Sequence, residues 1–245
     1  MKRNYEKIII VGDQHIPNQD EKTLKPFEKF LRKEMPDTLV INGDLLDFYD
    51  LSNFDKEITS EGLLQDELDA GYKLLKKYRT ILPKAKIYLT SSNHMENRLR
   101  RFKKTLGRAV HSLRYFTVPQ MLKLEELDIE PIDIVRYKNF LVMHGDLVRR
   151  HSAYTAKAML ETKGKSVFIG HTHRLGSHYK TDEGGEHVAV ECGCMCTLDP
   201  EYMDNLPNWQ QGFAIVYRDK TTDWFQHYLI PIIDNKFIWE GREYK

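Results

Sequence analysis

Five short apolar segments of this chain each end in side chains that can bind a metal ion. The stretches between them carry apolar residues at helical spacing, and this alternation predicts a layered α/β fold. In such folds, ligands collect where the strands end. One strand followed by a polar turn is commonplace, whereas five in series favour a site. The five ends are Asp13-Gln14-His15, Gly43-Asp44, Ser92-Asn93-His94, His144-Gly145-Asp146 and Gly170-His171-Thr172-His173.

The same patterns predict where the elements lie. We expect strands at 7–11, 38–41, 86–90, 132–137, 140–144, 166–169, 177–180, 188–192, 213–217 and 224–229. We expect helices at 21–33, 61–78, 96–106 and 153–162, with a peripheral helical segment within 107–126. The strands at 132–137 and 140–144 should form a hairpin across Lys138-Asn139. No repeat or linker interrupts the 245 residues, so we expect one domain spanning residues 1–245.

Composition excludes several classes of protein. Hydrophobic residues make up 41% and charged residues 30% of the chain, which is typical of a folded globular protein and not of a disordered one. The net charge of +1 gives no whole-protein field that would attract nucleic acid. No apolar run has the length of a signal peptide or a membrane span, so we expect a cytoplasmic protein without a membrane partner. The oligomeric state is not predicted.

Cys192, Cys194 and Cys196 are the only cysteines. They do not form a disulfide framework of the secreted type. Their alternation is typical of one face of a strand, which favours buried packing. A soft-metal site and a redox sensor are the alternatives.

The polar strand ends suit a particular metal chemistry. Carboxylate oxygens combined with neutral imidazoles favour Mn, Fe or Zn over Mg or Ca. In Asp13-x-His15 and His171-x-His173, the i, i+2 spacing can place two side chains on one side of an extended chain. A carboxylate such as Asp44 can bridge two ions about 3.5–4 Å apart. Such ions lower the pKa of a shared water, so that hydroxide is available near neutral pH.

The motifs D-x-H, G-D, N-H, H-G-D and G-H-T-H, in this order over residues 13–173, resemble the motif series of calcineurin-like metallophosphoesterases. That superfamily includes Ser/Thr protein phosphatases, nucleases and cyclic-nucleotide phosphodiesterases. The resemblance implies a four-layer α/β/β/α sandwich of two mixed sheets with two divalent metal ions at the sheet edges. Mn is the first expectation, with Fe, Zn or Ni as alternatives. The implied ligands are Asp13, His15, Asp44 and His173 for metal one, and Asp44, Asn93, His144 and His171 for metal two.

The resemblance also implies two catalytic residues that are not metal ligands. His94 would protonate the leaving oxygen or steady the phosphate, and Asp47 resembles the acid that orients this histidine. The sequence departs from the family at Ser92, where glycine is usual, and at Met95, where an acid is common. It also lacks the Arg-Gly that follows Asp47 in protein phosphatases.

A basic run follows the catalytic histidine. Residues 98–108 hold six cations and no acid. Arg98 is the best candidate for a phosphate clamp because its planar fork can grip two oxygens. Arg100 and Arg101 would extend a substrate-binding surface that tracks a polyanion. The alternative is a solvated amphipathic helix anchored by Leu99, Phe102 and Leu106.

These observations favour a two-metal phosphoesterase that uses metal-activated water. A phosphodiesterase or nuclease is the first hypothesis, with single-stranded nucleic acid or a nucleotide as the phosphate-ester substrate. A phosphomonoesterase, including a protein phosphatase, is the second. The third is a metal-binding scaffold without catalysis, which the complete ligand set and His94 argue against.

Overall fold

Two mixed β-sheets form the centre of the structure, a computed structural model that describes residues 4–52, 64–106, 113, 115–199 and 207–245. In the first sheet, β1 (Tyr5–Val11), β2 (Thr38–Ile41), β3 (Lys86–Thr90) and β4 (Ile129–Ile132) run parallel. Antiparallel β10 (Gly212–Asp219) and β11 (Phe225–Pro231) extend it beyond β1. The order is therefore β11-β10-β1-β2-β3-β4.

The second sheet has the order β5-β6-β7-β9-β8. The parallel strands are β6 (Phe140–Met143), β7 (Ser166–Ile169) and β9 (Gly185–Cys192). The antiparallel edges are β5 (Val135–Arg136) and β8 (Leu175–Asp182).

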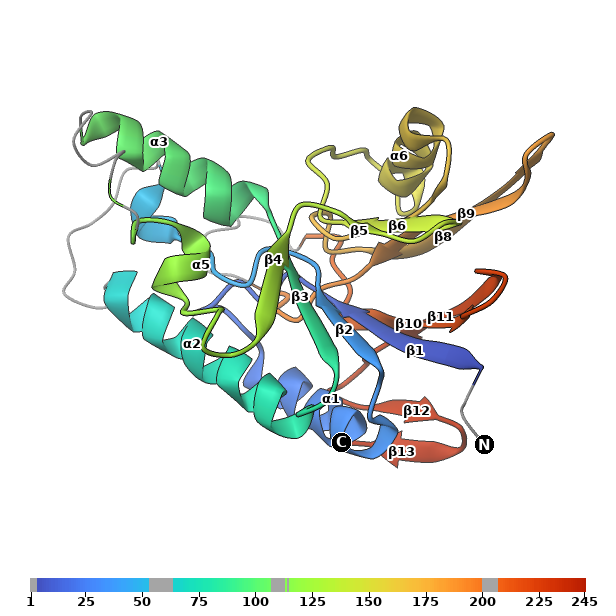
Figure 1. The fold of residues 1–245 in the computed structure, drawn as a ribbon, viewed down its shortest axis with the longest axis horizontal. Coiled ribbons are helices and arrows are strands. Elements are labelled where there is room, and N and C mark those ends of the chain that lie inside the picture. Colours follow the sequence, from blue (N-terminus) through green and yellow to red (C-terminus); the bar gives the residue numbers. More distant parts are fainter. Residues whose placement is uncertain (1–3, 53–63, 107–112, 114, 200–206) are drawn as a thin grey trace.

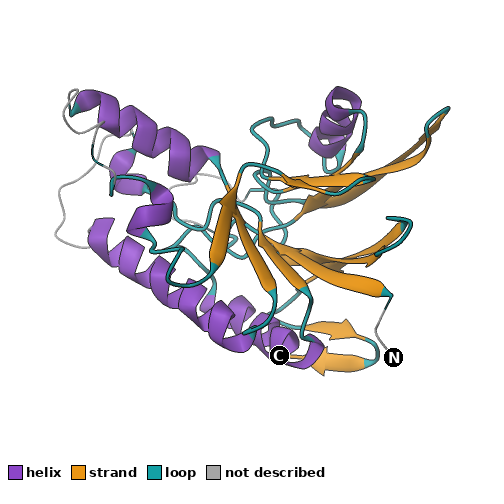
Figure 2. Cartoon of the chain, viewed as in Figure 1, coloured by secondary structure: helices purple, strands orange, loops and turns teal. Residues whose placement is uncertain are grey.

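Helices cover the outer faces of both sheets and complete four layers (Figures 1 and 2). Helices α1 (Glu21–Glu34) and α2 (Leu64–Ile81) lie on the first sheet, and α6 (Tyr154–Lys163) lies on the second. The π-helical turn η2 (Asn93–Asn97) leads into α3 (Arg98–Thr105), which runs outward past the short α5 (Val118–Met121). A 3-10 turn, η1, spans Tyr49–Leu51. The expected α/β/β/α sandwich is confirmed.

The layering explains why the central strands are apolar throughout. In β1, Ile9 and Val11 pack in the core beneath α1 and α2, whereas Ile8 and Ile10 pack between the two sheets. A strand that is buried on both faces carries a continuous apolar run and not an alternating one. A third core lies between the second sheet and α6, where Val167 and Ile169 of β7 contribute. The strands are thereby fixed on both sides, and the loops at their ends start from rigid positions.

Two elements differ from the sequence prediction. The segment 132–137 is not one strand of a hairpin, because β4 pairs with β3 in the first sheet and β5 pairs with β6 in the second. The chain crosses between the sheets at residues 133–134, so only the β5–β6 part of the expected hairpin forms. The hairpin of β12 (Phe237–Trp239) and β13 (Arg242–Tyr244) was not predicted. Its apolar anchors, Phe237 and Tyr244, pack on Phe30 of α1.

Other expected boundaries hold to within a few residues. Asp20 caps α1 by accepting hydrogen bonds from the N–H groups of Lys22 and Thr23. Part of the predicted helix 61–78, and much of the segment 107–126, lie outside the described residues. Among the helices that the structure describes, none is long and apolar enough to cross a membrane.

Candidate metal centre

The five polar strand ends meet at one place, where β1, β2 and β3 of the first sheet and β6 and β7 of the second sheet end. Parallel strands within one sheet deliver their carboxyl ends to the same edge. Because the two sheets are stacked, the two sets of loops face each other (Figure 1). The structure thereby brings together all seven residues that the sequence nominated as metal ligands: Asp13, His15, Asp44, Asn93, His144, His171 and His173.

A first group of ligand atoms consists of Asp13, His15 and His173, whose donor atoms lie within 4.8 Å of one another. His173 Nε2 is 3.2 Å from Asp13 Oδ1 and 2.9 Å from His15 Nε2. All three side chains are buried. Asp44 Oδ2 approaches this group, at 3.7 Å from His15 Nε2. Two nitrogens and two carboxylates thus converge in a geometry that suits a divalent cation.

A second group consists of Asp44, His144 and His171, again within 4.8 Å. His144 Nε2 is 3.0 Å from Asp44 Oδ2 and 3.0 Å from Asn93 Oδ1. Asp44 contacts both groups and therefore occupies the place of a bridging carboxylate. The main-chain N–H of His171 donates to Asp13 Oδ1 at 3.0 Å, which ties the two groups together from the other side.

Outer partners fix how two of the imidazoles face the centre. His15 Nδ1 lies 3.1 Å from Asp47 Oδ1, and His144 Nδ1 lies 2.8 Å from the Asn42 carbonyl oxygen. An acceptor at Nδ1 holds the ring proton there and leaves Nε2 free to bind a metal. The rings are therefore set with the correct nitrogen inward. Asn42 directly precedes Gly43-Asp44, yet nothing in the sequence marked its carbonyl as a partner of His144.

The backbone at the ligands is unusual. Positive φ angles occur at Asp13 (54°), His15 (49°), Asp44 (42°), His171 (68°) and His173 (57°). This left-handed region costs a non-glycine residue about 1–2 kcal/mol because Cβ crowds the following carbonyl oxygen. The expectation that the i, i+2 pairs lie on extended chain is therefore wrong. The loops hold these angles through hydrogen bonds between them, such as His15 N to Asp44 O at 2.9 Å.

The electrostatics of the cluster favour positive charge at its centre. Burial alone would raise the pKa of Asp13, but the nearby imidazoles of His173 and His15 outweigh it and hold the pKa well below the usual range. Burial would lower the pKa of His144, yet the Asp44 carboxylate raises it to about 9. His171 behaves oppositely, since burial and the neighbouring His144 lower its pKa to about 4. Divalent ions bound here would supply positive charge that balances the buried carboxylates.

His94, Asp47 and Arg98 form a second layer beside the ligand groups. His94 Nδ1 lies 2.7 Å from Asp47 Oδ1, and His94 Nε2 lies 4.0 Å from Asp44 Oδ2. Asp47 therefore contacts both His94 and His15. Arg98 donates to the Asp47 carbonyl oxygen at 2.7 Å and lies 3.5 Å from His94 Nε2. His94 sits at the solvent side of the cluster, where a leaving group could reach it.

The two departures from the family pattern near His94 have structural explanations. Met95 is fully buried and packs in the core, so an acid could not occupy its position. Glu96 accepts a hydrogen bond from the N–H of Ser92 at 2.6 Å and closes the π-helical turn. This turn lets the adjacent residues Asn93 and His94 both face the cluster, in keeping with the frequency of π-turns at functional sites.

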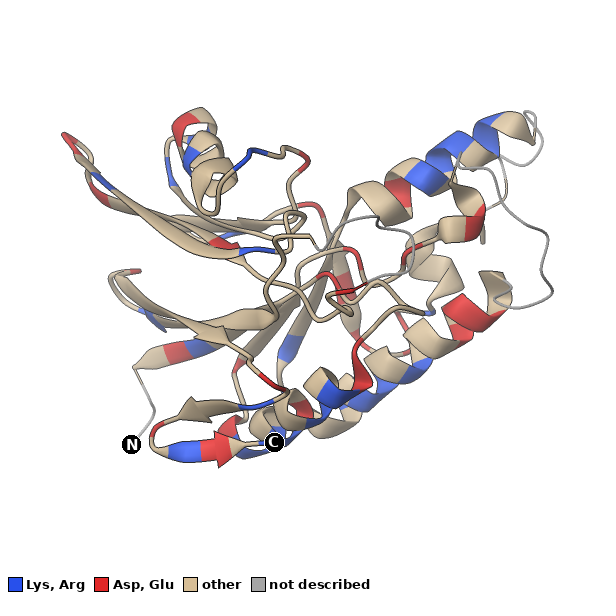
Figure 3. Cartoon of the chain, turned by 180° about the vertical axis from the view of Figure 1, so that it is seen from behind, with Lys and Arg blue, Asp and Glu red and all other residues tan. Residues whose placement is uncertain are grey.

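Arg100 and Arg101 do not join the cluster. Arg100 donates to Asn97 Oδ1 at 2.9 Å on its own helix, and Arg101 is exposed. Figure 3 shows the Lys and Arg residues of α3 on a helix that runs outward from the loops at the strand ends. Of the three arginines predicted from the sequence to bind substrate, Arg98 is the one whose guanidinium contacts Asp47. Leu106, expected as an apolar anchor of this helix, is 43% exposed.

A cleft of about 440 Å³ adjoins the second ligand group. Asn93 and His144 form its inner wall, so that it opens directly on the ligand atoms. Its charged lining is mainly acidic, from Glu96, Asp133 and Asp146, with Lys163 as the cation. The Trp209 ring packs against His173 at a tilt of 60°, with ring centroids 4.2 Å apart. Nothing in the sequence pointed to Trp209.

The family model described as calcineurin-like phosphoesterase matches residues 6–190, a span that includes every residue of both ligand groups. The chain belongs to this family. Among curated proteins, the chain is similar to the gene 54 proteins of two mycobacterium phages. It is 29% identical to that of phage L5 over 97% of this chain and 98% of the relative, and 26% identical to that of phage D29 over 96% and 97%.

Solved structures with a similar chain path include a novel archaeal phosphodiesterase, which is 15% identical. The match covers 91% of this protein and 99% of the archaeal chain, with a TM-score of 0.42. Vps29 from Entamoeba histolytica, in complex with Zn²⁺, is 14% identical over 95% and 96%, with a TM-score of 0.48.

Gly43 should be essential to the second ligand group. Its φ is 77°, and a Cβ there would lie 2.5 Å from His144 Nδ1. Gly43→Ala should displace His144 and weaken Mn²⁺ binding by about tenfold or more, as measured by calorimetry. Gly164→Ala is the matched control, because Gly164 also has a positive φ (64°) but a Cβ added there would meet nothing within 4 Å. It should lose about 1–2 kcal/mol of stability and keep its metal affinity.

Glu67 should make stability depend on pH. It is 7% exposed and accepts the Phe48 N–H at 2.5 Å, next to Asp47. Burial raises its pKa from 4.5 to about 8, with Asp47 and Asp50 adding to the rise and the Phe48 N–H opposing it. A carboxyl that holds its proton more tightly when folded lowers stability as pH rises from 4.5 to 8.

Glu67→Gln removes this titration while keeping an acceptor oxygen for Phe48. The variant should match the wild type near about pH 5 and exceed it by at least about 1 kcal/mol near about pH 9, measured by urea unfolding. Equal pH profiles for the two proteins would contradict the assignment.

Proposed function

We propose that this protein is a two-metal phosphoesterase, and specifically a phosphodiesterase that acts on a nucleotide or on short single-stranded nucleic acid. The observation that carries the proposal is the contact of Asp44 with both ligand groups, with His94 4.0 Å from the same carboxylate oxygen. A shared carboxylate beside a solvent-facing histidine is the arrangement that metal-assisted ester hydrolysis needs.

The residues fit two divalent ions. Asp13, His15, Asp44 and His173 would hold one ion, and Asp44, Asn93, His144 and His171 would hold the other. Mixed oxygen and imidazole ligands favour Mn, with Fe, Zn or Ni as alternatives. Two ions bound here would supply a water of lowered pKa and neutralise charge on the phosphoryl oxygens.

The remaining steps belong to the side chains of this chain. Asp47 accepts the Nδ1 proton of His94 at 2.7 Å, which directs Nε2 toward the cluster. Protonated His94 would then donate from Nε2 to the leaving oxygen as its bond to phosphorus breaks. Arg98 lies 3.5 Å from that nitrogen and can steady a phosphoryl oxygen through its other N–H groups. Catalysis therefore uses no protein nucleophile.

Three features support a small diester over a long polyanion or a phosphoprotein. The cleft beside His144 is mainly acidic, which disfavours a chain of phosphates at that position. Arg100 and Arg101 lie along a helix that leaves the site, so the expected basic track does not begin at the ligands. Asp47 is not followed by the Arg-Gly of protein phosphatases.

The free, buried cysteines are in keeping with action in the reducing cytoplasm.

Metal add-back tests this function directly. The metal-stripped protein is assayed on bis-p-nitrophenyl phosphate and p-nitrophenyl phosphate, with Mn, Fe, Zn, Ni and Mg added singly. We expect Mn-restored cleavage of the diester. Cleavage of the monoester alone would favour a phosphomonoesterase. Bound metal without turnover of either ester would favour the scaffold.

Single substitutions distinguish the metal ligands from the residue that assists the leaving group. His94→Ala should lower kcat by on the order of 10²–10⁴ and leave the binding of both ions nearly intact, because His94 only assists the leaving group. Asp44→Asn should weaken both ions together, since it contacts both groups. His178→Ala on β8 is the control and should change neither. Loss of metal in His94→Ala as severe as that in Asp44→Asn would reverse the assigned roles.

A further inference from the structure

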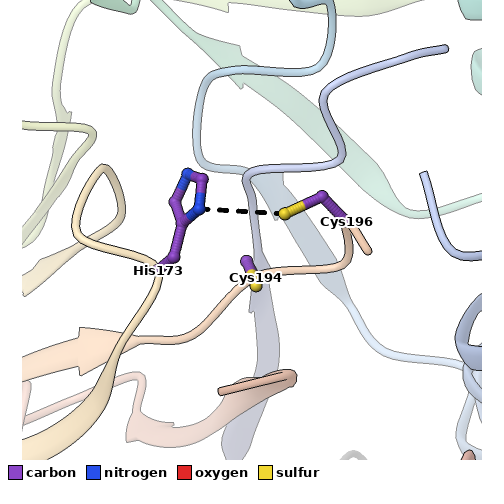
Figure 4. A group of neighbouring side chains, drawn as sticks. All are labelled: His173, Cys194 and Cys196. Carbon is purple, nitrogen blue, oxygen red and sulfur yellow. Dashed lines mark hydrogen bonds between the residues drawn. The ribbon is translucent and has the colours of Figure 1, made fainter. Parts of the chain in front are cut away.

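A sixth strand end reaches the metal centre. Strand β9 is parallel to β7 and ends at Cys192, and the chain then carries Cys194 and Cys196 past the ligand loops. Cys196 Sγ lies 3.7 Å from His173 Nδ1, and both side chains are buried (Figure 4). The sequence predicted that these cysteines are buried, but it did not predict that one of them contacts a ligand.

The contact falls on the ring nitrogen that faces away from the cluster. His173 Nε2 is directed at Asp13 Oδ1 and at His15 Nε2, so it is the nitrogen that would bind a cation held by these three residues. With Nε2 bound to a cation, the ring proton would lie on Nδ1, whose neighbour is Cys196 Sγ. Sulfur is a weak acceptor, but here the donor is an N–H that no water reaches.

Three imidazoles of the centre thus have an outer partner at Nδ1, each of a different kind. His15 has the Asp47 carboxylate, His144 has the Asn42 carbonyl and His173 has the Cys196 sulfur. The common feature is an acceptor that fixes the tautomer, which is how proteins orient histidine ligands. Cys196 occupies the position that an acid or a carbonyl occupies at the other two rings.

The main chain around Cys196 is held firmly enough for this purpose. The Cys196 carbonyl oxygen accepts from Gln211 Nε2 at 2.9 Å. The preceding Met195 donates its N–H to the carbonyl oxygen of Asp13 at 3.1 Å. The segment that carries the sulfur is therefore hydrogen-bonded to the strand end that supplies Asp13. The fold thereby sets the distance from Cys196 Sγ to His173.

Cys192, at the end of β9, provides a matched comparison. It is equally buried, but it packs in the core between the two sheets and lies outside the group of His173, Cys194 and Cys196, whose donor atoms lie within 4.8 Å of one another. Figure 4 shows the Cys196 sulfur directed at the His173 ring, with the hydrogen bond between these two residues. Removal of either thiol costs the core a similar volume, whereas only Cys196 holds Nδ1.

We propose that Cys196 is a positioning residue for the first metal ion: its sulfur accepts the Nδ1 proton of His173 and leaves Nε2 oriented toward Asp13 and His15. This inference rests on the proposed function, because it assigns His173 as a ligand. It adds a thiol to the set of outer acceptors that the site uses.

Metal affinity of the intact chain tests the role. Metal-stripped wild type, Cys196→Ala, Cys196→Ser and Cys192→Ala are titrated with Mn²⁺ by calorimetry. Cys196→Ala should weaken one of the two ions by about 10–100-fold. Cys196→Ser, whose hydroxyl can still accept, should recover most of this affinity, and Cys192→Ala should bind as the wild type does.

A second measurement needs no metal. Ring ¹H–¹⁵N correlation spectra of the metal-stripped proteins, recorded above the His173 pKa of about 9 so that the ring is neutral, report its tautomer, which should shift in Cys196→Ala and return in Cys196→Ser. Thermal unfolding confirms that each variant is folded. If Cys196→Ala does not fold, Cys196→Val takes its place, because valine fills a similar volume without an acceptor, and wild-type metal affinity in that variant would overturn the role.

Two further results separate this inference from the proposed function. Two ions bound by Cys196→Ala as tightly as by the wild type would refute the positioning role and leave the phosphoesterase proposal standing. A wild type that binds no divalent ion would overturn both together.

Discussion

Asp13, Asp44 and Asp47 are carboxylates buried at the meeting point of two sheets, and their charge is the constraint around which the site is arranged. A buried anion costs several kcal/mol unless it is paired. The chain offers no lysine to this cluster among the residues that the structure describes; instead it surrounds the carboxylates with imidazoles and with Arg98. Imidazoles titrate close to neutral pH and can give up a proton to make way for a metal ion, whereas the ammonium of a lysine, with an ordinary pKa of about 10.4, holds its proton more strongly. Pairing with histidine therefore stabilises the buried carboxylates and still allows a metal ion to replace the imidazole protons.

The scaffold holds the ligand residues in backbone conformations that they do not favour by themselves. Five of them hold backbone angles that side chains avoid, and loops with such angles persist only when their surroundings determine them. Here the loops follow strands buried on both faces and are tied to each other by hydrogen bonds such as Asp13 N to Gly43 O. The π-turn at Asn93–Asn97 acts in a similar way, since it directs the side chains of adjacent residues toward the metal centre.

The sequence predicted the fold class and the gathering of the ligands for one physical reason. Strand ends of a parallel sheet share an edge, so polar residues that follow apolar runs must meet there. It could not predict contacts that depend on the path of a loop, such as Asn42 with His144 or Trp209 with His173. The segment 132–137 was wrongly predicted as one strand because its two ends pair with strands of different sheets. Apolar patterning does not indicate which sheet a strand joins. The strand-end rule applied once more, after residue 192, would have pointed to Cys196.

The position of β1 in its sheet has a consequence for how the chain reaches this structure. One edge of β1 pairs with β2, which follows soon after it, but the other pairs with β10, where Ile9 lies opposite Ile215. During synthesis that second edge has no partner until nearly the whole chain has been made. Contacts between such distant segments close slowly because the intervening loop must first be ordered. The strand that carries the first ligands is thus completed among the last, and the metal centre should assemble only as the final strands of the first sheet come into place.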